Sequence, residues 1–178
     1  MLRLEDKETA EFRVGDLFDF YKGKRITKQD QIPGDTPYVT AVSTGNGIDS
    51  WIDNPEFTMK NIITMNFFGD CFYHPYEVAF KDGTYGLEIK DEDHRSPSHY
   101  IYFMTVIEKQ GKQRGSYSKM LTDSIAAEMK IPVPVTPTGE PDWEWMDAYI
   151  RQIEERERAN RRLSHRKEEA ILAALARR

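Results

Sequence analysis

Two short basic segments carry the side chains that are best suited to contact a polyanion. The first surrounds Gly23, which allows close backbone approach, and contains Lys22, Lys24, Arg25 and Lys28. The second contains Lys109, Lys112, Arg114 and Lys119, with Tyr117 interleaved. Lysine and arginine neutralise phosphate charge without reading sequence, so both segments favour contact with a nucleic-acid backbone. The competing interpretation is that they are ordinary solvated loops.

Reading bases would require planar polar side chains at loop tips, and Asn46, Gln29, Gln113 and Arg114 are the candidates. The overall charge does not indicate nucleic-acid binding, because the net charge is −5. Residues 1–150 carry 16 Lys+Arg and 25 Asp+Glu, a net of −9, whereas residues 151–178 carry 9 and 5, a net of +4. Nucleic-acid binding would therefore depend on local basic patches on an acidic body.

Residues that could perform catalysis are sparse. Glu88 and Lys90, after Asp70 or Asp82, imitate the acidic-x-lysine pattern of a metal-dependent nuclease, in which carboxylates hold Mg²⁺. Cys71 and His74 have the spacing of two metal ligands, but no second pair completes a site. We therefore expect no catalytic residue, no metal and no cofactor in this chain, with the nuclease as a minor alternative.

The totals predict one domain with an appendage in a reducing cytoplasm. Cys71 is the single cysteine and excludes an internal disulfide framework. No apolar run approaches the ~20 residues of a membrane span, and the first residues lack the apolar region of a signal peptide. We therefore expect a cytoplasmic protein without a membrane partner.

Short strand-like runs bounded by turns dominate the first 90 residues, which predicts an α+β fold with a mixed or antiparallel, β-rich domain. Residues 1–11 are expected to be a loose lead-in, and residues 21–31 a loop that enters a short helix near Thr27. The expected strands are 36–42, 61–66, 71–73, 77–80 and 85–89. Helices are expected at 98–109 and 119–130, separated by the basic loop 109–116 and followed by an extended segment, 131–135.

One uninterrupted helix is predicted from Pro141 onwards, because neither proline nor glycine follows it. The domain organisation is then a body at 1–135, a linker at 136–141 and a helix at 142–178. A helix of ~37 residues would span about 55 Å, longer than a small domain. Apolar residues occur near both ends of one face of this helix, and charged residues lie between the two groups. The apolar residues are Met146, Ile150, Ile153, Leu163, Ala170 and Ile171.

This face has two interpretations. The helix could be a surface helix with a solvated middle, or it could pair with a second helix as an antiparallel coiled coil, in which the polar centre fixes the register. Apolar positions beyond Leu163 need a cover that the body cannot easily provide. We therefore expect a homodimer or a partner protein on this helix.

The order of these segments resembles one target-recognition domain and its following helix in the DNA specificity subunit of Type I restriction–modification systems. The residues that carry the resemblance are Val14-Gly15-Asp16-Leu17-Phe18, Gly23-Lys24-Arg25-Ile26-Thr27, Pro37-Tyr38-Val39-Thr40-Ala41, Asn61-Ile62-Ile63-Thr64, Phe72-Tyr73-His74-Pro75-Tyr76, Tyr117-Ser118-Lys119 and Ile131-Pro132-Val133-Pro134. The closest similarity is Gly139-Glu140-Pro141-Asp142-Trp143-Glu144-Trp145-Met146, followed by Tyr149-Ile150.

The resemblance implies a non-catalytic subunit that recognises half of a bipartite site in double-stranded DNA. It also implies two kinds of partner: a DNA adenine methyltransferase subunit, which binds S-adenosylmethionine, and a restriction subunit. By resemblance, Lys22, Lys24, Arg25 and Lys28 face DNA, with Lys112, Arg114 and Tyr117 as weaker candidates. Asn46 is a DNA-binding candidate through its residue type alone. One domain and one helix are about half of a usual subunit, so a dimer through the helix is expected. An alternative is a half subunit that occupies methyltransferase partners without reading DNA.

Overall fold

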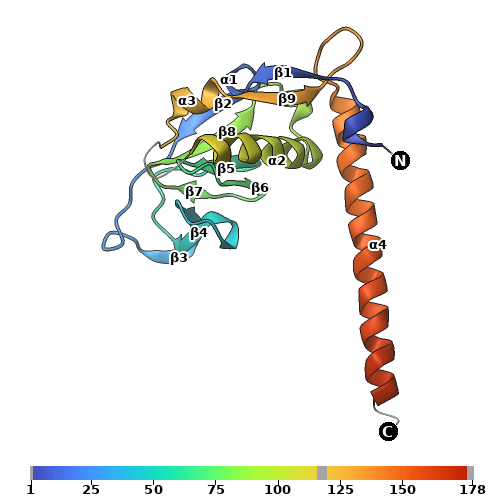
Figure 1. Cartoon of the computed structure of the whole chain (residues 1–178). Helices are drawn as coiled ribbons and strands as arrows, with labels where there is room; N and C mark the ends of the chain where they lie inside the picture. The colour runs from blue at the N-terminus through green and yellow to red at the C-terminus, as the bar shows by residue number, and fades with distance from the viewer. Residues whose placement is uncertain (1, 116–119, 176–178) are drawn as a thin grey trace.

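The computed structural model describes residues 2–115 and 120–175, with side chains through residue 169. A body of three small sheets and a long helix α2 is followed by α4, which extends far beyond the body (Figure 1). The α+β fold with a long C-terminal helix is thus confirmed, although no partner helix is present to test the coiled coil.

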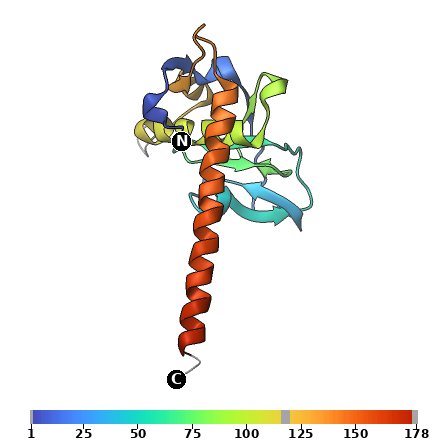
Figure 2. The same ribbon diagram turned by 90° about the vertical axis from the view of Figure 1, so that its right-hand side faces the viewer.

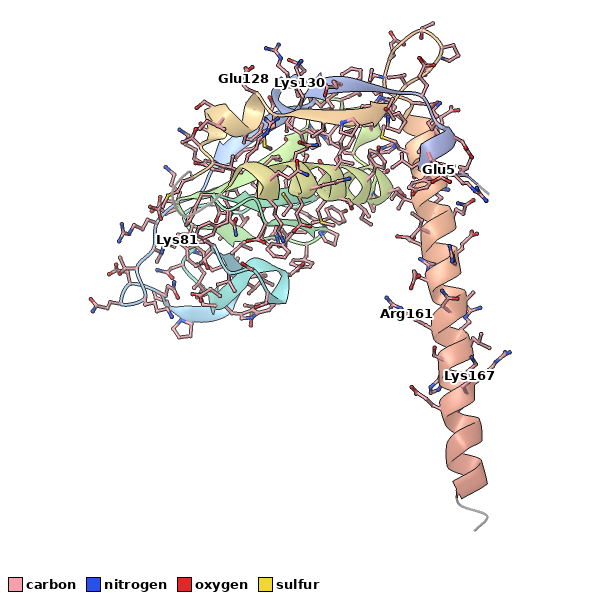
Figure 3. All side chains as sticks on the ribbon, in the orientation of Figure 1. Glu5, Lys81, Glu128, Lys130, Arg161 and Lys167 are labelled. Carbon is pink, nitrogen blue, oxygen red and sulfur yellow. The ribbon has the colours of Figure 1, made fainter. Side chains whose placement is uncertain are left out.

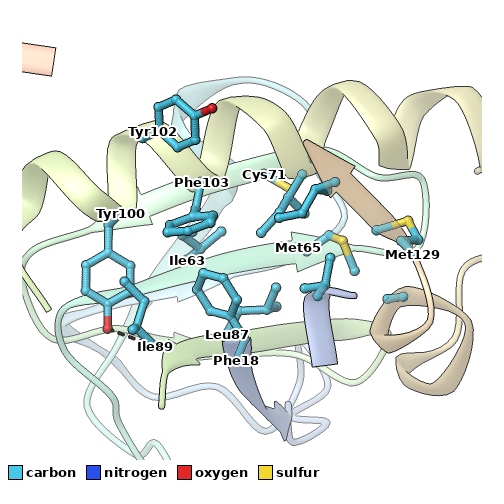
Figure 4. Close-up of a cluster of buried hydrophobic side chains, with 14 of the residues drawn as sticks. Phe18, Ile63, Met65, Cys71, Leu87, Ile89, Tyr100, Tyr102, Phe103 and Met129 are labelled. Atoms are coloured by element: carbon cyan, nitrogen blue, oxygen red, sulfur yellow. Dashed lines mark hydrogen bonds between the residues drawn. The ribbon is translucent and has the colours of Figure 1, made fainter. Parts of the chain in front are cut away.

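The central sheet has four strands in the order β2-β8-β5-β6, all antiparallel. Its strands are β2 (Phe18–Lys22), β5 (Ile62–Asn66), β6 (Cys71–His74) and β8 (Thr84–Ile89). α2 (Pro97–Arg114) packs across this sheet, and the main core lies between them (Figure 4). Phe18, Ile63, Leu87 and Phe103 are fully buried there. The predictions for residues 61–66, 71–73 and 85–89 are confirmed, because β-branched and aromatic runs bounded by turns are reliable strand signals.

The second sheet has three strands in the order β4-β3-β7. It consists of β3 (Pro33–Val39), β4 (Ile48–Ile52) and the short β7 (Ala79–Phe80), which runs parallel to β3. β3 begins and ends three residues earlier than the predicted 36–42, and β4 was not predicted. A small separate core of Ile26, Tyr38, Ile52 and Ala79 holds the loop before β3 against this sheet.

The third sheet pairs β1 (Thr9–Arg13) with β9 (Lys130–Pro134). The expectation of a loose lead-in over residues 1–11 is therefore wrong, because its last residues, 9–11, form a strand that pairs with residues 132–134. α1 (Val14–Leu17) follows β1, and the predicted helix 119–130 reduces in the described residues to α3 (Asp123–Ala127). No helix forms near Thr27, where residues 28–30 make a turn.

α2 is longer than predicted and includes most of residues 109–116, which were expected to form a basic loop. It starts at a cap in which the Ser96 hydroxyl accepts the His99 amide, and Pro97 occupies the first turn. It continues through Gly111 because that glycine lies against Gly69, where a β-carbon on Gly111 would be 3.0 Å from the Gly69 Cα. Gly111 thus serves close packing of the helix on a turn and does not break the helix.

α4 (Trp143–Leu175) begins one residue after its cap, Asp142, whose carboxylate accepts the Trp145 amide at 3.0 Å. Pro141 lies before the cap and pairs with Val135 across a tight turn. Asp142 also forms an ion pair of 2.6 Å with Lys7. The segment predicted as a linker, 136–141, is therefore a closed turn that joins β9 to the helix.

The first turns of α4 belong to the body. Trp143 stacks on His94 with ring centroids 4.3 Å apart, and Met146 and Ile150 are buried in the main core. Residues 155–169 of the helix are all exposed, and its C-terminal part extends away from the body, as the turned view also shows (Figure 2). No helix among the described residues combines the length and the apolarity that crossing a membrane requires.

Candidate nucleic-acid interface

Residues 23–28, here called the basic loop, leave the end of β2 in a fixed conformation. The Gly23 amide donates to the Thr84 carbonyl at 3.1 Å, and the Lys24 amide donates to the Phe80 carbonyl at 2.8 Å. A side chain on Gly23 would overlap the backbone of Lys81, so only glycine allows this approach. The N-terminal part of the loop is therefore attached to two strands of different sheets.

Tyr38 of β3 holds the middle of the basic loop. Its ring is 1% exposed, and its hydroxyl accepts the Ile26 amide at 3.0 Å and donates to the Lys24 carbonyl at 2.7 Å. Ile26 itself is 9% exposed and packs on the same small core. Burial raises the pKa of Tyr38, so its hydroxyl stays protonated and can keep donating. A buried side chain therefore presents the charged residues of the loop to solvent.

The C-terminal end of the loop is closed by short-range contacts. The Thr27 hydroxyl donates to the Asp30 carboxylate, and the Gln31 amide donates to the Thr27 carbonyl at 3.1 Å. Asn54 accepts the Ile32 amide at 2.9 Å through its side chain and donates to the Asp30 carbonyl at 2.9 Å. These bonds tie the end of the loop to the segment that follows β4.

A hollow of about 190 Å³ lies beside the loop, and it is here called the basic hollow. Its lining residues come from four separate parts of the chain. The polar ones include Arg25, Thr27, Lys28, Gln31, Asp49 and Lys81. Arg25, Lys28 and Lys81 make no ion pair among the described residues. Lys81 lies on the part of the body remote from α4 (Figure 3). Three cations without an ion-pair partner among the described residues thus line one concave region.

Two other predicted cations are already neutralised by the protein. Lys22, on β2, points to Asp123 with a Nζ–Oδ2 distance of 3.0 Å. A hydrogen bond from Lys22 holds the pKa of the Asp123 carboxyl below its usual value. Lys112 contacts Asp70 at 3.0 Å and Glu108 at 3.2 Å.

The second basic segment was misplaced by the prediction. Lys112 and Arg114 lie in the last turn of α2, not on a flexible loop, because Gly111 continues the helix. Tyr117 and Lys119 lie outside the described residues. Asn46 has the left-handed φ of 59° and donates to the Tyr76 hydroxyl at 3.0 Å. Of the predicted site residues, Lys24, Arg25 and Lys28 lie together on the basic loop. Lys22 lies at the end of β2, Lys112 and Arg114 lie on α2, and Asn46 lies on the turn before β4.

Sequence reasoning missed Tyr38, Asp49 and Lys81. Tyr38 was read only as a strand residue, and no local pattern links it to a loop 12 residues earlier. Lys81 and Asp49 join the hollow through the pairing of β3 with β7 and β4. Their association depends on the sheet order, which single-sequence patterns do not contain.

The predicted nuclease centre does not assemble. Lys90 donates to the Gly15 carbonyl at 2.6 Å, and Glu88 pairs with Arg95 at 3.3 Å. Asp70 is held by Asn66, Ser43 and Lys112, and these hydrogen bonds lower its pKa although burial opposes them. Within residues 2–115 and 120–175 no group of three or more potential metal ligands occurs.

The predicted dimer face of α4 needs correction at its start. Met146 is 0% and Ile150 7% exposed within a single chain, so neither offers a surface to a second helix. The same periodicity that suggested a coiled-coil seam therefore serves the body's own core there. Ile153 and Leu163 are 39% and 53% exposed and remain available. The side chains of Ala170 and Ile171 lie outside the described part of the structure.

The N-terminal segment extends the apolar surface around Ile153. The side chain of Gln152 makes two hydrogen bonds with the backbone of Leu2, at 2.8 and 3.0 Å. Leu2, Leu4 and Tyr149 line a hollow of about 380 Å³ together with Ile153. The apolar residues near the end of the body thus share this hollow with the charged residues Arg3, Glu5 and Arg156.

Residues 6–161 match the family described as "Type I restriction modification DNA specificity domain". The chain belongs to this family. The Type II restriction enzyme BgcI specificity subunit S.BcgI of Heyndrickxia coagulans is 29% identical over 155 residues, which are 85% of this chain and 45% of that protein. The chain spans less than half the length of this relative.

The specificity-domain fold is also found in solved structures of low sequence identity. The S subunit of a Type I restriction–modification system from M. genitalium aligns with a TM-score of 0.61 at 20% identity, over 91% of this chain and 43% of that one. The HsdS subunit of Thermoanaerobacter tengcongensis gives 0.59 at 15% identity, over 87% and 39%. These values establish a shared fold for the body and its helix. The matched region covers less than half of each of these two solved chains.

Proposed function

We propose that this specificity domain recognises a sequence in double-stranded DNA through the basic loop and the basic hollow, without catalytic activity of its own. The observation that carries the proposal is the arrangement of Arg25, Lys28 and Lys81. These cations have no ion-pair partner among the described residues. Arg25 and Lys28 belong to a loop whose backbone is fixed by Tyr38 and Gly23, and Lys81 lies on the turn against which Gly23 packs. A fixed cationic loop binds phosphates without an ordering cost, and family membership favours DNA as the polyanion.

A second copy of the chain would supply the second DNA-recognising body of a bipartite site. We propose that two α4 helices pair in antiparallel fashion through Ile153 and Leu163, so that two bodies read a symmetric bipartite site. The exposure of both side chains supports this pairing, because apolar residues on an isolated helix gain stability when covered. The assembly would position a DNA adenine methyltransferase subunit and a restriction subunit in the cytoplasm, and S-adenosylmethionine would be bound by the methyltransferase and not by this chain.

The test is binding of the full chain to a library of randomised duplexes, alone and again with the methyltransferase subunit of the same system. Enrichment of a defined sequence, with affinity that falls steeply as salt rises, is the expected result. Equal binding to all duplexes in both experiments would contradict sequence recognition. A duplex of scrambled composition serves as the reference for non-specific affinity.

A regulatory role without DNA reading is the second candidate. The net charge of −9 over residues 1–150 favours it, because an acidic body repels DNA at long range. In that case the chain would occupy methyltransferase partners and leave their complexes without sequence preference. Methyltransferase binding without any enriched duplex sequence would support this alternative.

A further inference from the structure

The basic hollow contains one carboxylate whose presence needs a reason. Asp49 lies on β4, where its neighbours Ile48 and Ser50 pair with Val39 and Tyr38. It lines the same hollow as Arg25, Lys28 and Lys81. Among the described residues Asp49 forms no ion pair and no side-chain hydrogen bond, so it does not serve to hold any of these cations in place.

An unpaired carboxylate on a surface that meets DNA weakens binding through repulsion from phosphates. Nearby cations reduce this repulsion, and the carboxylate contributes favourably where it accepts hydrogen bonds from the DNA itself. In the major groove the donors are the exocyclic amines of cytosine and adenine. Adenine presents its N7 acceptor beside its amine, and guanine and thymine present acceptor oxygens, so a carboxylate discriminates most strongly in favour of cytosine.

Arg25 provides the complementary half of this pattern within the same hollow. Its guanidinium matches the O6 and N7 acceptors of guanine, the base that pairs with cytosine. The hollow thus offers an acceptor and a donor fork together, as a C·G pair in the major groove requires. Lys28 and Lys81 remain available for the flanking phosphates.

We propose that Asp49 is a specificity-determining residue, which accepts a hydrogen bond from the amine of a cytosine in a C·G pair of the recognised sequence. The inference rests on the proposed DNA-reading function and adds to it the identity of one base and of the residue that reads it. It also explains why a negative charge is kept among three cations.

The experiment compares base preferences of the full wild-type chain, Asp49→Ala and Asp49→Asn by selection from a randomised duplex library and sequencing. For Asp49→Ala we expect a roughly ten-fold loss of preference for cytosine at one position, with the other positions unchanged. For Asp49→Asn we expect that position to shift towards adenine, because an amide pairs with the N6 and N7 edge. Asp49 is exposed, so both variants should melt at the wild-type temperature.

Asp82→Ala is the matched control, because Asp82 is an exposed carboxylate on the turn beside Lys81 that does not line the hollow. It should bind all duplexes slightly more tightly and keep the wild-type preferences. If Asp49→Ala behaves in the same way, the carboxylate reads no base and the inference is overturned, while the proposed function stands. If the wild-type chain enriches no sequence either alone or with the methyltransferase subunit, the proposed function fails and this inference fails with it.

Discussion

Gly23 lies so close to Lys81 that a β-carbon on the glycine would overlap the carbonyl oxygen of the lysine. The same β-carbon would be 2.6 Å from the Phe80 carbonyl oxygen. Neither obstacle is the end of a flexible side chain, because both belong to the backbone of β7 and the turn that follows it. The approach of two backbones at this point brings the basic loop and Lys81 to one hollow.

Gly23→Ala should therefore destabilise the protein and displace the basic loop. Overpacking of this kind costs about 1–3 kcal/mol, which chemical denaturation can measure. DNA affinity should fall as well, because the loop cations move relative to Lys81. Lys24→Ala is the control, since it removes a loop charge without a clash and should leave the unfolding free energy unchanged. Wild-type stability of Gly23→Ala would show that the backbones separate without cost.

Tyr38→Phe should loosen the basic loop while leaving every charge in place. The change removes both hydrogen bonds of the hydroxyl and leaves the Ile26 amide without its partner, at a cost of about 1–3 kcal/mol. DNA affinity should fall together with stability. Tyr100→Phe removes a comparable bond to the Ile89 amide, 3.3 Å long and drawn in Figure 4, in the main core. That control should lose stability and keep its DNA affinity, and equal affinities for both variants would contradict a positioning role for Tyr38.

Lys28→Gln and Lys22→Gln should differ in their effect on the salt dependence of DNA affinity, because Lys28 has no ion-pair partner among the described residues and Lys22 has one. If Lys28 meets one phosphate, its removal should reduce the slope of log affinity against log salt by about 0.9. Lys22 is paired with Asp123, so its replacement should change the slope much less. Fluorescence anisotropy on one duplex over a series of salt concentrations measures both slopes. Equal changes in the two variants would show that the Lys22–Asp123 pair opens on DNA.

Local patterns predicted the parts of this fold whose signals are local. The strands around Ile62–Asn66 and Thr84–Ile89 have β-branched or aromatic runs between turn residues, and the structure confirms them. β1 was not predicted because it is short and polar, and because its strand partner, β9, is far away in the sequence. Local patterns did not predict the basic hollow for the same reason. Residues 25–28, 49 and 81 come together through the strand order β4-β3-β7.

The helix shows a different limit of pattern reading. Apolar residues at helical spacing indicate which face is covered, but not by what. Met146 and Ile153 belong to one continuous pattern, although the first is buried by the chain's own body and the second is left exposed. The packing of α2 and β9 against α4 separates the two roles.

Ile153→Asp combined with Leu163→Asp should convert the proposed dimer into a monomer. Both side chains are exposed in the single chain, so the double variant should keep the thermal stability of the body. Sedimentation equilibrium should show the mass of one chain, and an unchanged mass would contradict pairing through these residues. Met146→Ala should instead lower the unfolding free energy by about 2–5 kcal/mol, because it creates a cavity in the core. Its effect on mass is therefore no test of the dimer.

His74 should make the stability of the body depend on pH between about 4 and 6.5. Its ring is fully buried, Nε2 lies 2.8 Å from the Thr64 hydroxyl, and Nδ1 has no hydrogen-bond partner among the described residues. Burial lowers the pKa of His74 to about 4, whereas an unfolded chain has a pKa of about 6.5. As the pH falls through this range the unfolded state takes up a proton that the folded state refuses, so stability is lost on acidification.

The loss attributable to His74 between pH 7.5 and pH 4.5 should be about 2–3 kcal/mol. His74→Gln keeps a polar side chain near Thr64 and removes the titration. Urea denaturation of both proteins at the two pH values isolates the histidine, because carboxyls with lowered pKa, such as Asp70 and Asp142, contribute equally to each. The variant should therefore lose about 2–3 kcal/mol less than the wild type on acidification. An identical loss in the two proteins would mean that His74 accepts a proton inside the folded core, so that its burial does not exclude charge.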